Sequence, residues 1–216
     1  MSSVSFPRLK IDHWVRLGSE LGAPRWDSSI HARLLAAYRE TPRFYHNEEH
    51  LAECLAVFDQ MRDLARRPEA VECALWFHDA VYDPRASNNE EQSAILAAEV
   101  LNNAGVVPAR IKEIEYLILA TKNHQPGDRP DAQVVIDADL SILGQPELRF
   151  WRYEAGIASE YAWVPCDAYR QKRSEILTRF LARPAIYQTP YAAGHYEQSA
   201  RKNLGSAIEK LQSTHP

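Results

Sequence analysis

The residues of this chain that could do chemistry are histidines and aspartates in four short segments. In chain order, the segments are Tyr45-His46-Asn47-Glu48-Glu49-His50, His78-Asp79, Thr121-Lys122-Asn123-His124 and Asp137-Ala138-Asp139-Leu140. Imidazole nitrogens and carboxylate oxygens bind hard or borderline divalent cations. Such a cation lowers the pKa of bound water and so makes hydroxide at neutral pH. The pattern therefore favours a metal-dependent hydrolase.

The spacing of these residues supports a shared site. His46 and His50 are four residues apart, so a helix that begins between them would turn both imidazoles to the same side. His78 and Asp79 end an apolar stretch, where an unpaired buried charge would cost several kcal/mol. Asp139 also lies among apolar neighbours, and a bound cation would remove the cost at both places. Taken singly, each histidine is more often an ordinary polar side chain than a ligand, so only the whole set is informative.

The ordered set of a histidine, a His-Asp pair and a later aspartate resembles the HD superfamily of metal-dependent phosphohydrolases. Three segments are similar to the signatures of the cyclic-nucleotide phosphodiesterases in that superfamily: Tyr45-His46-Asn47 with His50, His78-Asp79, and Ala138-Asp139-Leu140-Ser141. The whole chain, including residues 74–82 and 137–144, is more similar still to a group of small bacterial predicted HD phosphohydrolases. The resemblance covers most of the chain and implies a single HD-type helical domain over residues 1–216.

The resemblance also implies roles for individual residues. It makes His50, His78, Asp79 and Asp139 the ligands of a divalent metal ion, and Asp79 would also help to activate water. It places His46 like the histidine that protonates the leaving oxygen in the phosphodiesterases. Four ligands leave room on an octahedral ion for water and a substrate oxygen, and an imidazole titrates in the useful range. The ion would be magnesium, manganese, cobalt, nickel, zinc or iron, with one or two ions per chain.

Two further residues have both a functional and an ordinary interpretation. His124 follows a helix at the point where some HD proteins with two metals supply an additional histidine, although a solvent-facing loop histidine explains it equally well. Glu90 could orient the attacking water or bind a second ion. Acidic residues are also common in the first turn of a helix because the helix dipole favours them, which is the slightly more frequent case. We predict His124 as a metal ligand and Glu90 as a catalytic residue.

A phosphoryl substrate needs cationic groups near the metal ion. From their sequence positions we predict Arg43, Lys122 and Arg201 as substrate-binding residues, although each is more often a surface charge. Arg201 also lies four residues after Glu197, and a salt bridge within one helix would explain that spacing without a substrate.

The function expected from these residues is hydrolysis of a phosphoester or phosphoanhydride in a small, nucleotide-like molecule by metal-activated water. Two alternatives stay open. A di-iron HD-fold oxygenase would use an extra histidine such as His124, and a non-catalytic nucleotide-binding sensor would keep the site for binding only. The expected partner is a small phosphorylated molecule, and a homodimer is left open.

Length, charge and cysteine content narrow the class of protein. At 216 residues one domain is the default, and the formal charge of −4 would repel polymeric nucleic acid. No apolar stretch reaches the roughly 20 residues of a membrane span. Residues 1–7 lack a basic segment followed by an apolar one, so a cytoplasmic protein is expected. Cys54, Cys73 and Cys166 have no CxxC spacing, which favours reduced, mostly buried thiols over a disulfide or a zinc knuckle.

The elements that must position these residues are helices. Apolar residues recur at three- and four-residue steps almost throughout, and alternation at period two is rare, so we predict an all-α fold. The stretch from Val71 to Val81 is apolar on nearly every side and is expected to be central. The predicted helices span about 10–21, 28 to the Thr41-Pro42 step, 47–61, 68–80, 90–103, 108–124, 134–143, 146–161, 165–182 and 196–212.

Overall fold

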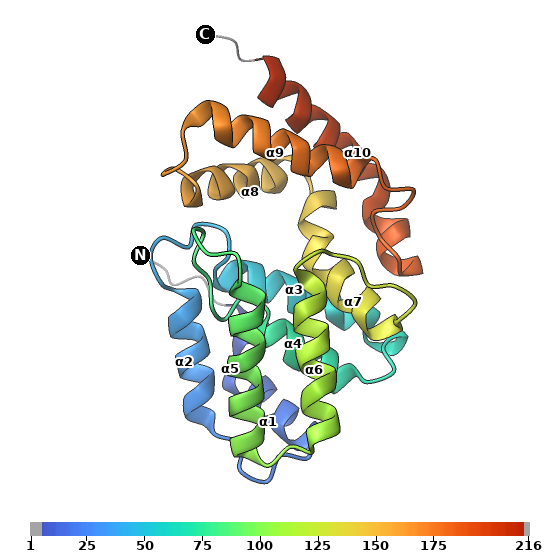
Figure 1. The fold of residues 1–216 in the computed structure, drawn as a ribbon. Helices are drawn as coiled ribbons and strands as arrows, with labels where there is room; N and C mark the ends of the chain where they lie inside the picture. The colour runs from blue at the N-terminus through green and yellow to red at the C-terminus, as the bar shows by residue number, and fades with distance from the viewer. Residues whose placement is uncertain (1–5, 214–216) are drawn as a thin grey trace. The chain divides into compact units, whose positions relative to one another are not determined.

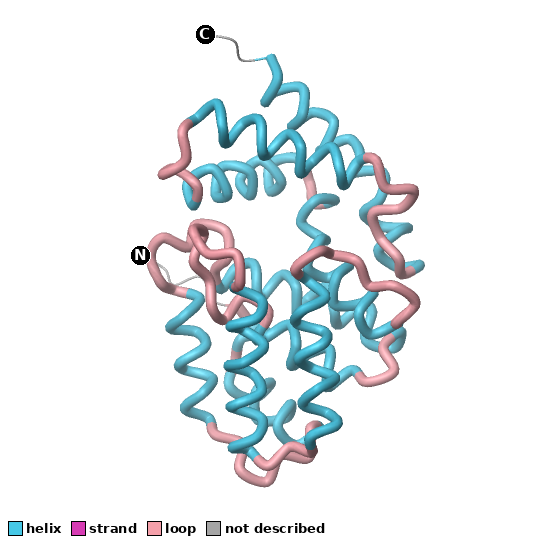
Figure 2. The backbone as a smooth tube through the Cα atoms, viewed as in Figure 1, coloured by secondary structure: helices cyan, strands magenta, loops and turns pink. Residues whose placement is uncertain are grey.

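In the computed structural model, which describes residues 6–213, every regular element is helical (Figures 1 and 2). In chain order the α-helices are α1 Ile11–Glu20, α2 Ser28–Tyr38, α3 Glu48–Met61, α4 Pro68–Phe77, α5 Asn89–Ala104, α6 Pro108–Thr121, α7 Pro130–Asp139, α8 Glu147–Glu160, α9 Cys166–Leu181 and α10 Pro190–Ser213. Short 3-10 helices cover Pro7–Leu9, Arg62–Leu64 and Leu140–Gly144. The prediction of an all-α fold is confirmed.

The helices belong to two units, of which the first ends at Asp139 and the second begins at Leu140. The first unit contains α1 to α7, and the second contains α8 to α10. The helix that we predicted over residues 134–143 is divided at this boundary into the end of α7 and a 3-10 helix. One domain over residues 1–216 stays a prediction.

Two observations bear on the expected location of the protein. Among residues 6–213, none of the helices has both the length and the apolar composition that crossing a membrane requires. Residues 1–5, on which the expectation of a cytoplasmic protein partly rests, lie outside the described residues. The location therefore stays a prediction.

The central helix of the first unit is α4. Residues 70–77 of this helix are all buried, and it packs against α1, α3, α5, α6 and α7. The helices α5 and α6 lie side by side and are joined by a short connection (Figure 1). Pro68 suits the first turn of α4, because a proline lacks the N–H that would have no helical partner there. The prediction of a central, apolar fourth helix is confirmed.

The end of α4 differs from the prediction, because the helix ends at Phe77 and not at Ala80. The N–H of Ala80 donates to the carbonyl oxygen of Phe77 at 3.0 Å, which is a tighter turn than an α-helix makes. The carbonyl oxygens of Asp79 and Ala80 accept hydrogen bonds from the side chain of Arg43 instead of continuing the helix. His78 and Asp79 therefore lie in the turn that follows α4.

Asn47 caps α3, as the sequence predicts. Its Oδ1 accepts hydrogen bonds from the N–H groups of Glu49 at 2.9 Å and His50 at 3.4 Å. Glu48 and Glu49 in the first turn also suit the positive end of the helix dipole. This cap sets the start of the helix, so that His46 precedes it and His50 lies within the first turn.

A buried carboxylate on α4 is held by three arginines. Glu72 has no exposed surface. Its oxygens lie 3.0 Å from Arg8 Nη2, 2.7 Å from Arg16 Nη2 and 2.8 Å from Arg62 Nη1. These arginines come from the first 3-10 helix, from α1 and from the segment after α3. One carboxylate thus joins three segments to the helix that leads into His78.

Replacing Glu72 by Gln is expected to lower the free energy of unfolding by about 3 kcal/mol, because it removes the one fully buried negative charge that three guanidinium groups share. This loss is at the lower end of the range for removing one partner of a buried ion pair. The side chains of Arg16 and Arg62 are 37% and 26% exposed, so solvent screens part of their charge. Glu20 is the matched control, because it pairs with the same two arginines but is 33% exposed. Glu20→Gln is expected to cost less than about 1 kcal/mol. Urea unfolding measures both variants, and equal losses would contradict the expectation for Glu72.

In the second unit, α10 packs on α9 and on the 3-10 helix that precedes α8. The Asn203 Nδ2 group of α10 donates to the carbonyl oxygens of Leu143 at 2.8 Å and Gln145 at 2.9 Å. Gly144 allows a close approach to Tyr196 of α10, because a Cβ at position 144 would lie 2.4 Å from the Cβ and 2.7 Å from the carbonyl oxygen of Tyr196. A larger residue at position 144 would push α10 away.

The last helix begins at Pro190, six residues before the predicted start at Tyr196. The hydroxyl oxygen of Thr189 accepts a hydrogen bond from the N–H of Ala192 at 3.2 Å and so caps the helix. The pair Thr189-Pro190 is a sequence signal for a helix start, because threonine is a common N-cap and proline is common at the first helical position. Gly194 lies within the first turns of this helix, where glycine is unfavourable, so residue types near the start favour a helix less than those after Tyr196.

Candidate metal centre

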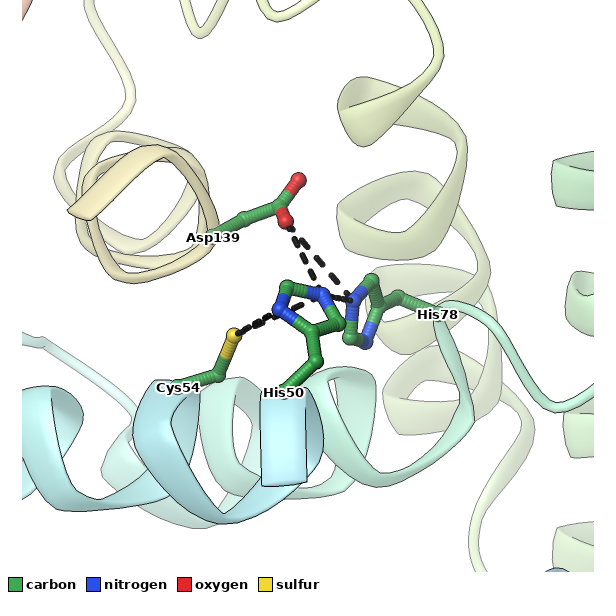
Figure 3. A group of neighbouring side chains, drawn as sticks. All are labelled: His50, Cys54, His78 and Asp139. Atoms are coloured by element: carbon green, nitrogen blue, oxygen red, sulfur yellow. Dashed lines mark hydrogen bonds and ion pairs between the residues drawn. The ribbon is translucent and has the colours of Figure 1, made fainter. Parts of the chain in front are cut away.

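Three segments of the first unit bring His50, His78 and Asp139 together (Figure 3). His50 lies in the first turn of α3, His78 directly follows α4, and Asp139 is the last residue of α7. The Nε2 atom of His50 is 3.1 Å from Nε2 of His78 and 3.3 Å from Oδ1 of Asp139. The Nε2 atom of His78 is 3.8 Å from the same oxygen. Residues far apart in the sequence therefore place their donor atoms around one point.

Asp79 adds a second carboxylate to this group. Its Oδ2 lies 3.4 Å from Nε2 of His50 and 3.1 Å from Nε2 of His78. The side chains of both histidines are 1% exposed, whereas those of Asp79 and Asp139 are 16% and 14% exposed. The donor set is thus buried at its imidazoles and reachable from solvent at its carboxylates.

Cys54 is a possible donor that the sequence analysis did not assign to the site. It is buried, and its Sγ lies 3.6 Å from Nδ1 and 3.7 Å from Nε2 of His50. Donor atoms of His50, Cys54, His78 and Asp139 all lie within 4.8 Å of one another. Burial raises the pKa of the Cys54 thiol to about 11. The four-residue spacing from His50 on one helix is the signal that could have identified it.

The electrostatics of the centre couple its acids to its bases. Burial alone would raise the pKa of Asp79, but the charge of His78 outweighs it and holds this pKa well below its usual value. The pKa of Asp139 is lowered in the same way, with burial outweighed by hydrogen bonds from His124 and His50. Conversely, burial disfavours charge on His50 and His78, but the neighbouring acidic groups raise the pKa of both imidazoles. Two ionised carboxylates therefore attract positive charge to this point.

This donor set fits a divalent cation. Ligands about 2.1 Å from one ion lie about 3.0–3.4 Å from their neighbours, and most of the distances between His50, His78, Asp79 and Asp139 are close to this range. Two imidazoles and two carboxylates suit zinc, cobalt, manganese or iron, and a thiol adds affinity for the softer of these ions. The buried group of His50, Cys54, His78 and Asp139 could hold a metal ion.

Metal binding at this centre is expected to strengthen as the pH rises. Because the pKa of His50 lies well above its usual value, the imidazole holds a proton at neutral pH that a cation must displace. Asp79 and Asp139 have lowered pKa values and are already ionised, so they release none. The affinity for Zn²⁺ should rise about tenfold per pH unit for each proton displaced. Calorimetric titration in two buffers of different ionisation enthalpy counts these protons, and binding below neutral pH without proton release would contradict the expectation.

His46 lies beside this group of donors. Its ring centroid is 5.9 Å from that of His50. The imidazole stacks on the ring of Tyr82 at 4.2 Å, with an angle of 26° between the planes. Such a position suits an imidazole that meets a substrate next to the ion. The role of His46 as proton donor stays a prediction.

His124 contacts the outer oxygen of a predicted ligand. Its Nε2 lies 3.2 Å from Oδ2 of Asp139, and its side chain is 26% exposed. Its backbone has φ +49°, in the left-handed region that residues other than glycine rarely adopt. His124 thus contacts Asp139, and its assignment as a metal ligand stays a prediction.

Two other predicted residues lie on or beside α5 and α6. Glu90 is half-buried in the first turn of α5, where the helix dipole favours an acid. Lys122 follows α6, and its Nζ donates to the carbonyl oxygen of Ser87 at 2.8 Å and pairs with Glu91. Lys122 thus ties the loop before α5 to the end of α6. Catalysis by Glu90 and substrate binding by Lys122 stay predictions.

The remaining predicted substrate-binding residues hold main-chain segments. Arg201, in the second unit, donates its Nε to Glu197 at 2.8 Å and its other nitrogens to carbonyl oxygens within 181–184. The salt bridge that its spacing suggests is therefore present. Arg43 is buried, and it donates to the carbonyl oxygen of Asp79. Substrate contacts by these two arginines stay predictions.

A buried cluster of His50, Cys54, His78 and Asp139 in an all-helical structure is compatible with a metal site of the HD type. Comparison of the chain with models of protein families, with characterised proteins and with solved structures finds no match.

Proposed function

We propose that the protein is a metal-dependent phosphohydrolase of the HD type, which cleaves a phosphoester or phosphoanhydride bond in a small, nucleotide-like molecule. The observation that supports this most is the convergence of two imidazoles and two carboxylates. Asp79 Oδ2 lies within 3.4 Å of Nε2 in both His50 and His78, and Asp139 Oδ1 lies 3.3 Å from His50. These four residues are the ones that the resemblance to the HD superfamily makes ligands.

A divalent ion held by His50, His78, Asp79 and Asp139 would lower the pKa of water and neutralise negative charge on the phosphoryl oxygens. Asp79 stays ionised at neutral pH because its pKa is low, so it would accept a hydrogen bond from the attacking water and orient it. His124 contacts Oδ2 of Asp139 and would keep that carboxylate in place.

His46 would serve as the proton donor. Hydrolysis forms one bond from the water oxygen to phosphorus and breaks the bond from phosphorus to the leaving oxygen, which then needs a proton. His46 would supply this proton and be reprotonated by solvent. The stack on Tyr82 at 4.2 Å would hold the imidazole plane in one orientation beside the metal ligands.

The test is a hydrolysis screen with defined metal loading. Purified protein is stripped with a chelator, reloaded with magnesium, manganese, cobalt, zinc or iron, and incubated with nucleotides and phosphorylated metabolites. We expect phosphate release from at least one class of compound, lost on chelation and restored by the ion. Protein that binds metal but releases phosphate from no compound with any ion would contradict the proposed function.

One contact favours a second candidate function. Asp139 faces His50 with Oδ1 and His124 with Oδ2, which is an arrangement that could serve two ions. A di-iron oxygenase would need such a pair. Metal analysis of protein purified without added ions separates the candidates, because two irons per chain with oxygen uptake would support the oxygenase. A nucleotide that raises the melting temperature and is recovered unchanged would instead support a non-catalytic sensor.

A further inference from the structure

Arg43 binds the main chain of two segments that carry predicted functional residues. It lies in the connection between α2 and α3, and its side chain is 2% exposed. Its Nη1 donates to the carbonyl oxygen of Asp79 at 2.6 Å and to that of His46 at 3.4 Å. Its Nη2 donates to the carbonyl oxygen of Ala80 at 3.1 Å. One guanidinium therefore connects the segment of the proposed proton donor to the segment of a proposed metal ligand.

Aromatic rings enclose the same guanidinium. Its Cζ lies 5.4 Å from the ring centroid of Tyr38 and 5.6 Å from that of Tyr82, within the range of cation–π contacts. Tyr82 also stacks on His46, so the ring touches both the guanidinium and the imidazole. The nearby carboxylate of Glu40 is 3.7 Å away and 64% exposed, and it therefore contributes little. Rings and carbonyl oxygens near the C-terminal end of α4, where the helix dipole favours a cation, stabilise the charge of Arg43.

We propose that Arg43 is a positioning residue, which holds the main chain of Asp79 and His46 so that the metal ligand and the proton donor face the same substrate. This inference rests on the proposed function and gives Arg43 a role other than a phosphate contact. A side chain that is 2% exposed and already donates three hydrogen bonds has little surface left for a phosphoryl group. The planar fork of arginine reaches carbonyl oxygens in both segments, which the single ammonium of lysine cannot do.

The two roles predict different kinetics. Loss of a phosphate contact raises KM and leaves the affinity for the metal ion unchanged. Loss of a positioning contact moves Asp79 and His46, so it weakens metal binding and lowers kcat with little change in KM. Metal affinity is measured without substrate, so this readout does not depend on the reaction.

The experiment compares Arg43→Ala and Arg43→Lys with the unmodified protein by calorimetric titration with Co²⁺ and by steady-state kinetics. We expect the affinity for Co²⁺ to fall about 10–100-fold in Arg43→Ala, as it does when a residue that orients a metal ligand is removed. Arg43→Lys keeps the charge and loses the fork, and it should recover only part of the affinity. Guanidinium ion at millimolar concentration should restore binding to Arg43→Ala, whereas ammonium should not.

Arg62→Ala is the matched control. Arg62 also lies over an aromatic ring, with its Cζ 5.4 Å from the centroid of Phe58, and it pairs with the buried Glu72. It follows α3 and is about 18 Å along the helix from His50, by a rise of 1.5 Å per residue. This variant should lose stability and keep the affinity for Co²⁺.

Three results would overturn the proposal for Arg43. These are unchanged Co²⁺ affinity in both Arg43 variants, a rise in KM alone, and an equal loss of affinity in Arg62→Ala. A different result would contradict the proposed function: unmodified protein that binds Co²⁺ and hydrolyses no phosphorylated compound with any of the ions in the screen. In that case the affinity measurements still decide whether Arg43 positions Asp79.

Discussion

Replacing His78 by Ala is expected to remove the bound metal ion and the hydrolytic activity together. The Nδ1–H of His78 donates to the carbonyl oxygen of Leu75 at 2.8 Å, which fixes the tautomer and leaves the Nε2 lone pair for a cation. That Nε2 lies 3.1 Å from both His50 Nε2 and Asp79 Oδ2, so its loss removes a donor from the middle of the set. Removing a residue that only hydrogen-bonds to a metal ligand lowers metal affinity about 10–100-fold. Loss of His78, a ligand itself, should therefore lower the affinity by more than about a hundredfold.

The matched control for this variant is His31→Ala. His31 is also a buried histidine, 9% exposed, and its Nε2 donates to the carbonyl oxygen of Leu9 at 2.8 Å. It packs against Trp14 and Trp76, so its loss should lower the melting temperature. The metal content, measured by mass spectrometry, and the affinity for Co²⁺, measured by titration, should fall only in His78→Ala. Equal retention of metal by both variants would remove His78 from the ligand set.

Replacing His46 by Ala is expected to lower kcat about 10²–10⁴-fold and to leave the metal ion bound, because general acid catalysis contributes a factor of this size. The ring of His46 is centred 5.9 Å from that of His50, beside the donors. The loss should depend on the leaving group. A substrate such as p-nitrophenyl phosphate needs little protonation of its leaving oxygen, so the variant should retain much more activity with it than with a nucleotide.

His195→Ala is the control for the stacking contact. His195 stacks on Tyr191 at 4.0 Å, much as His46 stacks on Tyr82 at 4.2 Å, but it lies on α10 in the second unit. Its removal should leave kcat and metal content unchanged. Equal loss of activity by His46→Ala toward both kinds of leaving group, or loss of the metal ion, would contradict the role of His46 as a proton donor.

The helical class and several boundaries could be predicted because they depend on local sequence. The three- and four-residue recurrence of apolar side chains predicts helices throughout, and Asn47 caps α3 through contacts with its own next residues. The end of α4 could not be predicted in this way. It depends on hydrogen bonds from Arg43, which lies more than thirty residues earlier in the chain, to Asp79 and Ala80.

The donor set was partly predictable for a similar reason. The sequence shows that His78 and Asp139 occur among apolar residues and need partners, but it does not show that α3, α4 and α7 bring them together. Cys54 was missed because a thiol in an apolar helix pattern looks the same whether it packs in a core or faces an imidazole. Arg43 was predicted as a substrate-binding residue from its sequence position, which does not show that the rings of Tyr38 and Tyr82 pack against its guanidinium.

The most direct test of the metal centre is a crystal of the protein grown with Co²⁺ and measured at the cobalt absorption edge. We expect an anomalous peak about 2.0–2.2 Å from Nε2 of both His50 and His78 and within similar reach of a carboxylate oxygen of Asp79 and of Asp139. The distance from the peak to Cys54 Sγ would also show whether the thiol is a ligand. A cobalt peak elsewhere in the protein, with none within bonding distance of these four side chains, would contradict the proposed metal centre and the hydrolysis that depends on it.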